Sequence, residues 1–207
     1  LISVDDHAEN SIVVASGANM LLNEQDVDKV VEEMCEGDIL LMQLEIPIQT
    51  VEYAARRAFE KGVKVVLNPA PARSLPKELL RHLFMITPNR IEAEMLTGIK
   101  IVNDADAERV AKEISAMGVQ NIIVTLGSKG CLVREGDTSY CVDAFKVEPV
   151  DTTAAGDTFN GALCVGLAEG MNLRQAAVMA SKASSVAVTR MGAQSSIPHR
   201  KELNLNE

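Results

Sequence analysis

Short apolar runs alternate with segments of helical periodicity over the first 125 residues, and this alternation constrains the fold more than any other feature. The runs have the length and composition of buried strands and lie at residues 39–42, 63–67, 84–87 and 122–125. The helical segments lie near residues 25–36, 48–62, 90–97 and 104–118. Buried strands separated by helices are typical of a parallel sheet. We therefore predict an α/β fold with a mainly parallel sheet covered by helices.

The pattern changes after Gly127. Short apolar runs near residues 131–134 and 138–142 flank a Glu-Gly-Asp turn, which is typical of a hairpin and predicts an antiparallel edge of the sheet. Two helices near residues 157–169 and 173–190 follow, and Gly192 is expected to end the second one. At the start of the chain, residues 1–4 and 11–14 predict two strands joined by a polar turn.

The composition of the chain restricts its class. A length of 207 residues with 47% hydrophobic and 24% charged residues is enough for one domain with a sizeable core. The 29 acidic residues outnumber the 20 basic ones and no basic block occurs, so a nucleic-acid partner is not expected. No run reaches membrane-spanning length, and four cysteines without paired spacing indicate reduced thiols. We expect a cytoplasmic protein that does not bind membranes.

Residues 151–161 carry the strongest chemical signal and read Asp-Thr-Thr-Ala-Ala-Gly-Asp-Thr-Phe-Asn-Gly. Ala154, Ala155 and Gly156 are small, so backbone N–H groups can approach an anion at the start of the following helix. Asp157 lies in the first helical turn, where the helix dipole favours its ionised form. Such a carboxylate suits a base that takes a proton from a substrate hydroxyl. The segment therefore predicts an anion site with a built-in base.

Structural explanations compete with the chemical ones. Asp157 or Thr158 could simply cap the helix, as Asp and Thr often do. Asn89 follows a proline and has Glu92 three residues after it, which is the spacing of a capping box. Both explanations remain open from the residues alone.

Two further segments follow predicted strands. Residues 127–130 read Gly-Ser-Lys-Gly, and a glycine-bounded stretch of this kind by itself usually indicates only a turn. Glu45 lies beyond the carboxyl end of a strand, where open α/β sheets place ligands, although a solvated loop residue is the alternative. The chain has neither a P-loop motif nor a dinucleotide-binding glycine motif, which argues against a P-loop kinase and a standard dehydrogenase.

The 151–161 segment resembles the signature of the ribokinase family of carbohydrate kinases, also called the PfkB family. Five other segments resemble that family in the same order, at residues 42–45, 68–73, 87–92, 125–130 and 188–194. The resemblance covers essentially the whole chain and implies a ribokinase-like three-layer α/β/α sandwich. The family's N-terminal third has no counterpart here, so we expect a fragment of a longer protein. Residues 1–18 would be partial strands of a small β lid, and residues 19–207 the nucleotide-binding and catalytic domain.

The resemblance implies ATP-dependent phosphorylation of ribose. The backbone of Ala154, Ala155 and Gly156 would form the anion hole, Asp157 would act as the base and also contact the substrate, and Glu45 would bind the sugar. Ser181 lies where family members often carry a larger side chain near the adenine. The implied nucleotide-binding residues are Asn89, Thr125, Leu126, Gly127, Ser128, Lys129, Gly130, Gly156 and Ser181.

The resemblance also implies two metal ions and a dimer. Glu92 would organise Mg²⁺ through water. A monovalent cation, K⁺, would lie beside the anion hole, and most of its ligands would be backbone oxygens. The implied K⁺ positions are Asp151, Thr153, Ala187, Arg190, Gly192 and Ser196. A homodimer formed through the lid is expected for the complete protein.

Two other functions remain open at this stage. The same machinery could phosphorylate another sugar or a nucleoside, because the N-terminal third of the family carries most of the sugar specificity. The chain could also be a non-catalytic nucleotide-binding fragment. For the 207 residues alone we expect ATP binding with little sugar turnover.

Overall fold

The computed structural model describes residues 2–4 and 10–203 and divides the chain into two compact units. The first unit comprises residues 1–15, 127–130 and 142–207, and the second comprises residues 16–126 and 131–141.

The second unit is built on a six-stranded sheet in the order β3-β4-β5-β6-β7-β8. The first four strands pair in parallel and β7 pairs antiparallel with β6. This confirms the predicted mainly parallel sheet with an antiparallel edge. The strands are β3 (Ile39–Met42), β4 (Lys64–Leu67), β5 (Met85–Ile86), β6 (Asn121–Thr125), β7 (Cys131–Glu135) and β8 (Thr138–Val142).

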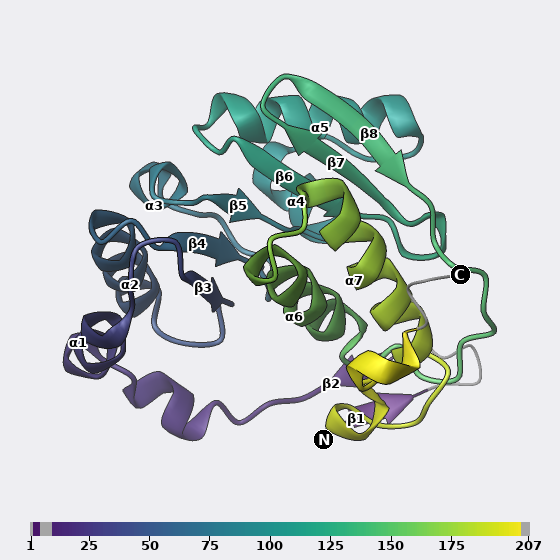
Figure 1. Cartoon of the computed structure of the whole chain (residues 1–207), viewed down its shortest axis with the longest axis horizontal. Helices are drawn as coiled ribbons and strands as arrows, with labels where there is room; N and C mark the ends of the chain where they lie inside the picture. The colour runs from purple at the N-terminus through teal and green to yellow at the C-terminus, as the bar shows by residue number, and fades with distance from the viewer. Residues whose placement is uncertain (1, 5–9, 204–207) are drawn as a thin grey trace. The chain divides into compact units, whose positions relative to one another are not determined.

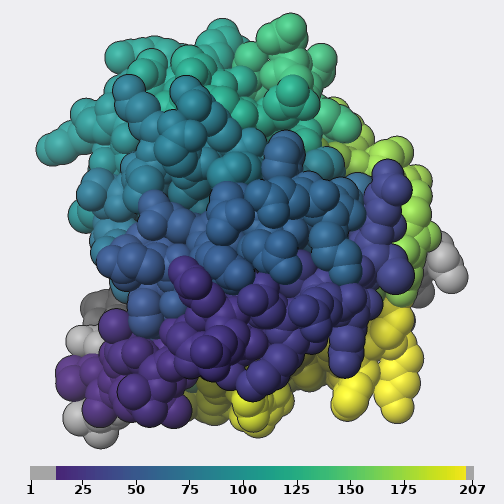
Figure 2. All heavy atoms as spheres, turned by 90° about the vertical axis from the view of Figure 1, so that its left-hand side faces the viewer, coloured from purple at the N-terminus to yellow at the C-terminus, as the bar shows by residue number. Residues whose placement is uncertain are grey.

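The helices of the second unit connect the parallel strands. Because the strand order advances in one direction and such crossovers are nearly always right-handed, the connecting helices fall on one face of the sheet. Figure 1 shows α1, α2 and α3 together on one side, and Figure 2 shows the continuous outer surface, purple to teal, of this part of the chain. The helices are α1 (Glu24–Glu33), α2 (Ile48–Glu60), α3 (Lys77–Arg81), α4 (Arg90–Thr97) and α5 (Asp104–Ala116), preceded by a short 3-10 helix, η1 (Gly17–Leu21).

Asparagine side chains set the start of several of these helices. The Asn23 side chain accepts the Gln25 N–H at 2.9 Å at the start of α1, and Asn103 accepts the Asp106 N–H at 3.0 Å at the start of α5. Gly98 ends α4 with a left-handed backbone at φ 73°. Local residues therefore determine where most of these helices begin or end. The sequence patterns missed α3, which is only five residues long.

The core of the second unit lies between the sheet and these helices. Val65 and Leu67 on β4 and Ile122 and Val124 on β6 point to this core and are fully buried. Alternate positions along a strand share a face, so these pairs place one face of each strand against the helices. Their packing fixes the register that holds the strand ends in place.

The first unit contains the two N-terminal strands and the last two long helices. Strands β1 (Ile2–Val4) and β2 (Asn10–Ile12) pair antiparallel, as predicted, whereas the expected turn at residues 5–9 lies outside the described residues. Helices α6 (Ala155–Ala168) and α7 (Leu173–Ala187) run side by side in Figure 1. A Cβ atom at Gly166 would lie 3.2 Å from Ala176, so the missing side chain lets the two backbones approach closely.

The predicted end of α7 is wrong. The helix ends at Ala187 rather than at Gly192. The carbonyl of Val188 accepts the Val150 N–H at 2.7 Å and the Asp151 N–H at 3.2 Å, so a distant segment takes the place of further helical turns. Gly192, at φ 93°, lies in the loop that follows. Two 3-10 helices, η3 (Gln194–Ser196) and η4 (Arg200–Glu202), complete the described chain.

Gly130 is a position where only glycine fits. Its φ is 85°, and a Cβ atom there would fall on the Val142 carbonyl oxygen and 2.6 Å from the Ala144 nitrogen. Gly136, in the β7–β8 turn, has φ 56° but no atom within 4 Å of the same position. Both substitutions to alanine carry left-handed strain of about 1–2 kcal/mol. We expect Gly130→Ala to lower the free energy of unfolding by roughly 2 kcal/mol more than Gly136→Ala, because only Gly130→Ala also overpacks against backbone.

Urea unfolding of the two variants measures this difference. Equal unfolding midpoints for Gly130→Ala and Gly136→Ala would contradict the prediction, because they would show that the backbone around Gly130 moves to accept the added methyl group without cost.

Candidate active site

Helix α6 begins without a side-chain cap. Its N-cap residue is Ala154, which has a left-handed backbone at φ 59° and ψ 15°. This conformation costs a non-glycine residue on the order of 1 kcal/mol. Asp157 is the third residue of the helix and Thr158 the fourth, so neither is the N-cap residue. The explanation that Asp157 or Thr158 is the N-cap residue of α6 is therefore wrong.

The first turn of α6 is accessible at Gly156 and Asp157, which are both exposed. Of the three predicted anion-hole residues, Ala155 has an N–H group that donates to the Thr152 carbonyl, at 3.2 Å. This N–H group is therefore less available to an anion than one without such a bond. The first N–H groups of a helix have no partner within the helix and carry partial positive charge. In addition, the Thr158 Oγ1 is buried and has no hydrogen-bond partner among the described residues. The turn thus offers donors and a carboxylate together.

Asp151 is buried just before this turn. Its Oδ1 accepts the Thr153 N–H and its Oδ2 accepts the Gly192 N–H, both at 2.9 Å. The Thr153 side chain and these two N–H groups lower the pKa of the Asp151 carboxyl from its ordinary value. Within the described part of the chain, the buried Thr153 Oγ1 has no hydrogen-bond partner of good geometry. Asp151 therefore holds negative charge beside a buried hydroxyl oxygen, which is close enough to lower the pKa of this carboxyl and keeps lone pairs for a ligand.

The other predicted cation positions lie in the same unit. The Arg190 side chain pairs with Glu202 at 2.6 Å, and the Ser196 hydroxyl donates to the Ala193 carbonyl at 2.7 Å. Ala187 is fully buried at the end of α7. Because these side chains are engaged or apolar, only their backbone oxygens are suited to a cation. A carboxylate, a buried hydroxyl oxygen and backbone carbonyls are hard oxygen donors, so the residues present fit K⁺.

The capping box at Asn89 is confirmed in the second unit. The Asn89 N–H donates to Glu92 Oε2 at 2.8 Å, and the Glu92 N–H donates to Asn89 Oδ1 at 2.9 Å. Burial of Glu92, which is 5% exposed, raises the pKa of its carboxyl, and the hydrogen bond from the Asn89 backbone partly opposes this rise. Thr125 lies next to this helix start, because its N–H donates to the Pro88 carbonyl at 3.0 Å. Asn89, Glu92 and Thr125 are thus brought together.

Glu92 is the residue predicted to organise Mg²⁺ in the second unit. Among residues 2–4 and 10–203 no group of three His, Cys, Asp or Glu side chains is placed to hold a metal ion. Mg²⁺ usually keeps several waters and needs only one or two protein carboxylates besides substrate phosphates. Glu92 alone is compatible with that mode of binding.

The loop after β6 is a tight glycine turn. Residues Gly127–Lys129 form a 3-10 helix, and the Gly130 N–H donates to the Gly127 carbonyl at 2.9 Å. Ser128 and Lys129 are exposed, whereas Leu126 is half-buried. This turn lies at the carboxyl end of β6, where parallel sheets place ligands.

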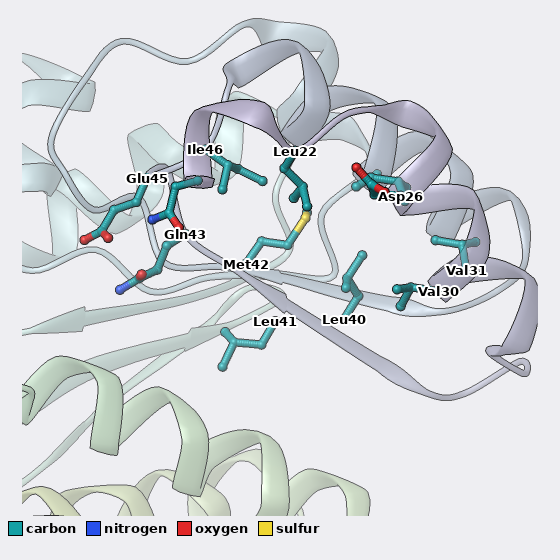
Figure 3. A pocket seen from close by; sticks show the side chains of 13 residues that line it. Leu22, Asp26, Val30, Val31, Leu40, Leu41, Met42, Gln43, Glu45 and Ile46 are labelled. Carbon is teal, nitrogen blue, oxygen red and sulfur yellow. The ribbon is translucent and has the colours of Figure 1, made fainter. Parts of the chain in front are cut away.

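Glu45 lies three residues beyond β3 and is exposed. It lines a cavity of about 350 Å³ whose other walls come from η1, α1 and β3. Figure 3 shows Glu45 and Gln43 at one end of this cavity and Val30 and Val31 at the other. Its lining is mostly apolar, and Glu45 is the only predicted site residue in it. Ser181, by contrast, is buried on α7 in the first unit.

Sequence reasoning missed two side chains at α6. The Ser184 hydroxyl on α7 donates to the Ala155 carbonyl at 3.0 Å, and the Asn160 side chain donates to the Gly156 carbonyl at 2.9 Å. Asn160 lies inside the motif, so its place in the segment was a usable signal. Ser184 lies among other small residues of α7, where nothing in the pattern distinguishes it.

These features define an α/β protein with an accessible helix start that carries its own carboxylate. Residues 1–200 match the family model described as pfkB family carbohydrate kinase. The chain belongs to this family.

Relatives of known structure and name agree. The chain is 45% identical over 201 residues to a ribokinase from Haemophilus influenzae, covering 97% of this chain and 66% of that protein. It is 34% identical to a deoxyribokinase from Salmonella typhi, covering 98% and 67%. The structure of an Arabidopsis thaliana ribokinase complexed with ribose and ATP matches with a TM-score of 0.86 and 30% identity, covering 98% and 66%. The predicted ribokinase-like α/β fold is confirmed, and the chain spans about two thirds of these proteins.

No helix in the described part of the chain is long and apolar enough to cross a membrane.

The lowered pKa of Asp151 gives a testable pH dependence. An ordinary aspartate in the unfolded chain titrates near pH 4. Because the pKa of Asp151 is lower in the folded state, its contribution to stability is fully present above about pH 4 and is lost as the pH falls through the folded-state value. Asp151→Asn lacks this titration. We expect the variant to be less stable than the parent at pH 6, with a difference that shrinks at pH 3.

Urea unfolding of the parent and of Asp151→Asn at both pH values provides the measurement. A stability difference that stays constant between pH 6 and pH 3 would contradict the assigned role of these hydrogen bonds.

Proposed function

We propose that this protein transfers the γ-phosphoryl group of ATP to the terminal hydroxyl of ribose, forming ribose 5-phosphate. The observation that carries the proposal is the exposed start of α6, where Gly156 and Asp157 stand together without a cap. The names of the relatives support ribose and ATP as substrates.

The chemistry follows from the residues of the first turn. Asp157 takes the proton from the sugar hydroxyl, and the resulting oxygen attacks the γ-phosphorus as the bond to the bridging oxygen of ADP breaks. The backbone around Ala154, Ala155 and Gly156 binds the negative charge that spreads over the transferred group. Positioning and charge stabilisation account for most catalysis of phosphoryl transfer. A short backbone segment with one base therefore supplies the essential catalytic groups of the protein.

The remaining predicted residues bind the substrates in this proposal. Glu45 accepts hydrogen bonds from sugar hydroxyls. The turn at Gly127–Lys129 binds the phosphates of ATP through backbone N–H groups and Lys129. Asn89 and Ser181 lie along the nucleotide. The other nucleotide-binding residues are Thr125, Leu126, Gly130 and Gly156.

Two ions complete the proposal. Glu92 holds Mg²⁺ through water, and the K⁺ ligands are Asp151, Thr153, and backbone oxygens of Ala187, Arg190, Gly192 and Ser196. When bound, Mg²⁺ neutralises charge on the β- and γ-phosphates and K⁺ orders the loop before α6. The buried Thr153 Oγ1, which has no partner of good geometry among the described residues, supports the second assignment.

A second candidate substrate is deoxyribose. The deoxyribokinase relative supports it, because it matches this chain over nearly the same length as the ribokinases do. Other sugars or nucleosides, and a non-catalytic nucleotide-binding fragment, are weaker alternatives.

We also propose a cytoplasmic protein that forms a homodimer through the lid when complete. Cys35 and Cys164 are free thiols, which fits a reducing compartment. Strands β1 and β2 form the antiparallel pair that such a lid requires.

A ribose assay tests the proposed reaction. ATP consumption is measured with ribose, deoxyribose and a sugar panel, with and without K⁺, for the 207-residue chain and for a fusion to the unmatched third of the Haemophilus influenzae ribokinase. We expect the chain alone to bind ATP with little turnover. The fusion should phosphorylate ribose faster than deoxyribose and more rapidly with K⁺. A folded fusion that binds ATP but consumes none with any sugar would refute the proposal.

Replacement of Asp157 tests the base. In the active fusion we expect Asp157→Asn to lower kcat by roughly 10²- to 10⁴-fold, the usual contribution of a general base, with ATP affinity nearly unchanged. Asp143→Asn, an exposed aspartate of the same unit, is the control and should retain activity. Turnover by Asp157→Asn comparable to that of the parent would rule out Asp157 as the base.

A further inference from the structure

The first two peptide groups of α6 are each held from their carbonyl side by a side chain. The Ala155 carbonyl accepts the hydroxyl of Ser184, 29 residues later on α7, at 3.0 Å. The Gly156 carbonyl accepts the side-chain amide of Asn160 at 2.9 Å. These two carbonyls belong to consecutive peptide groups, so the pair of donors fixes consecutive planes of the backbone.

Holding a carbonyl also sets the direction of an N–H group. A peptide group is planar and trans, so its C=O and N–H point in opposite directions. The peptide group that contains the Ala155 carbonyl contains the Gly156 N–H, and the one that contains the Gly156 carbonyl contains the Asp157 N–H. Ser184 and Asn160 therefore orient the two N–H groups at the exposed face of the turn.

The turn needs such support because its own residues are permissive. Ala154 supplies no side-chain cap and has a left-handed backbone. Gly156 has no Cβ, and a Cβ atom placed there would meet nothing within 4 Å. Glycine has the widest choice of backbone angles, so the helix by itself restrains the Gly156 peptides less than it would at another residue. Donors to a developing charge must be held to within roughly 10–20° to be effective.

The two donors differ in kind: Asn160 bonds the carbonyl four residues before it on α6, whereas Ser184 bonds α6 from α7. Asn160 is 3% exposed, and burying an amide side chain is costly unless it is hydrogen-bonded. The neighbouring Ser185 makes the ordinary local bond of a helical serine, to the Lys182 carbonyl at 2.7 Å. Ser184, in contrast, reaches across to the other helix. The tie to Ala155 therefore distinguishes Ser184 from the adjacent serine on the same helix.

We propose that Ser184 and Asn160 are positioning residues that preorganise the phosphoryl-binding turn of α6, by fixing the peptide groups that carry the Gly156 and Asp157 N–H groups. The proposal rests on the proposed function for its effect on rate, whereas the orientation of the backbone can be measured without any reaction.

The first test measures the backbone directly. Amide ¹⁵N relaxation of the 207-residue chain reports the order parameters of the Gly156 and Asp157 N–H groups, which are near 0.85 for rigid backbone. We expect lower values in Ser184→Ala and in Asn160→Leu, and unchanged values in the control Ser185→Ala. Ser184→Thr keeps a hydroxyl and should restore the order parameter of Gly156. Unchanged order parameters at Gly156 and Asp157 in Ser184→Ala and Asn160→Leu would overturn the proposal whether or not the protein is a ribose kinase.

The second test separates positioning from a general loss of structure. In the active fusion, Ser184→Ala and Asn160→Leu should each lower kcat by roughly 10- to 100-fold. The KM values for ATP and ribose should stay within about twofold, because the turn acts mainly on the developing charge. Ser184→Thr should recover most of the rate, and Ser185→Ala should keep it. Equal kcat in Ser184→Ala and the parent, measured in a fusion that phosphorylates ribose, would also overturn the proposal while leaving the proposed function intact.

Discussion

Parallel pairing of β3, β4, β5 and β6 is the constraint on which the second unit depends. Because these strands run in the same direction and in fixed register, their carboxyl ends meet at one edge of the sheet. Glu45 follows β3, Asn89 follows β5, and Thr125 ends β6. Glu45 and Thr125, 80 positions apart in the sequence, are thus placed at the same edge of the sheet by backbone hydrogen bonds. The side chains at these positions can differ without disturbing the sheet that places them.

Much of this arrangement could be predicted from sequence because it depends on local patterns. The strand at residues 39–42, the hairpin around Gly136 and the capping box of Asn89 and Glu92 all follow from short-range chemistry. The end of α7 could not be predicted, since Val188 gives its carbonyl to Val150 and Asp151 rather than to a local cap. Ser184 was missed for the same reason, because its hydrogen bond to Ala155 exists only after α6 and α7 pack together.

Two carboxylates show how environment rather than residue type sets charge. Glu92 is buried, and burial raises the pKa of its carboxyl because the charged form is poorly solvated, although Asn89 donates to both carboxylate oxygens. Asp151 is also buried, but N–H groups and the Thr153 side chain lie against its oxygens, and its pKa falls. Burial raises the pKa of both carboxyls, but at Asp151 the hydrogen bonds outweigh it, whereas at Glu92 burial is the larger effect. A positive ion near Glu92 would supply the compensation that Asp151 already receives from the backbone.

Close packing of α6 on α7 has a mechanical consequence. The absent side chain of Gly166 allows the two helices to touch through Ala176, and Ser184 ties α7 to the opposite end of α6. Because the two helices are in close contact near both ends, we expect them to move together as one rigid body. A displacement of α7 along its axis is carried to the Ala155 carbonyl. The loop that follows Ala187 is held to Asp151 by the hydrogen bond from the Gly192 N–H. A movement of this loop at the end of α7 is therefore expected to shift the backbone at the start of α6.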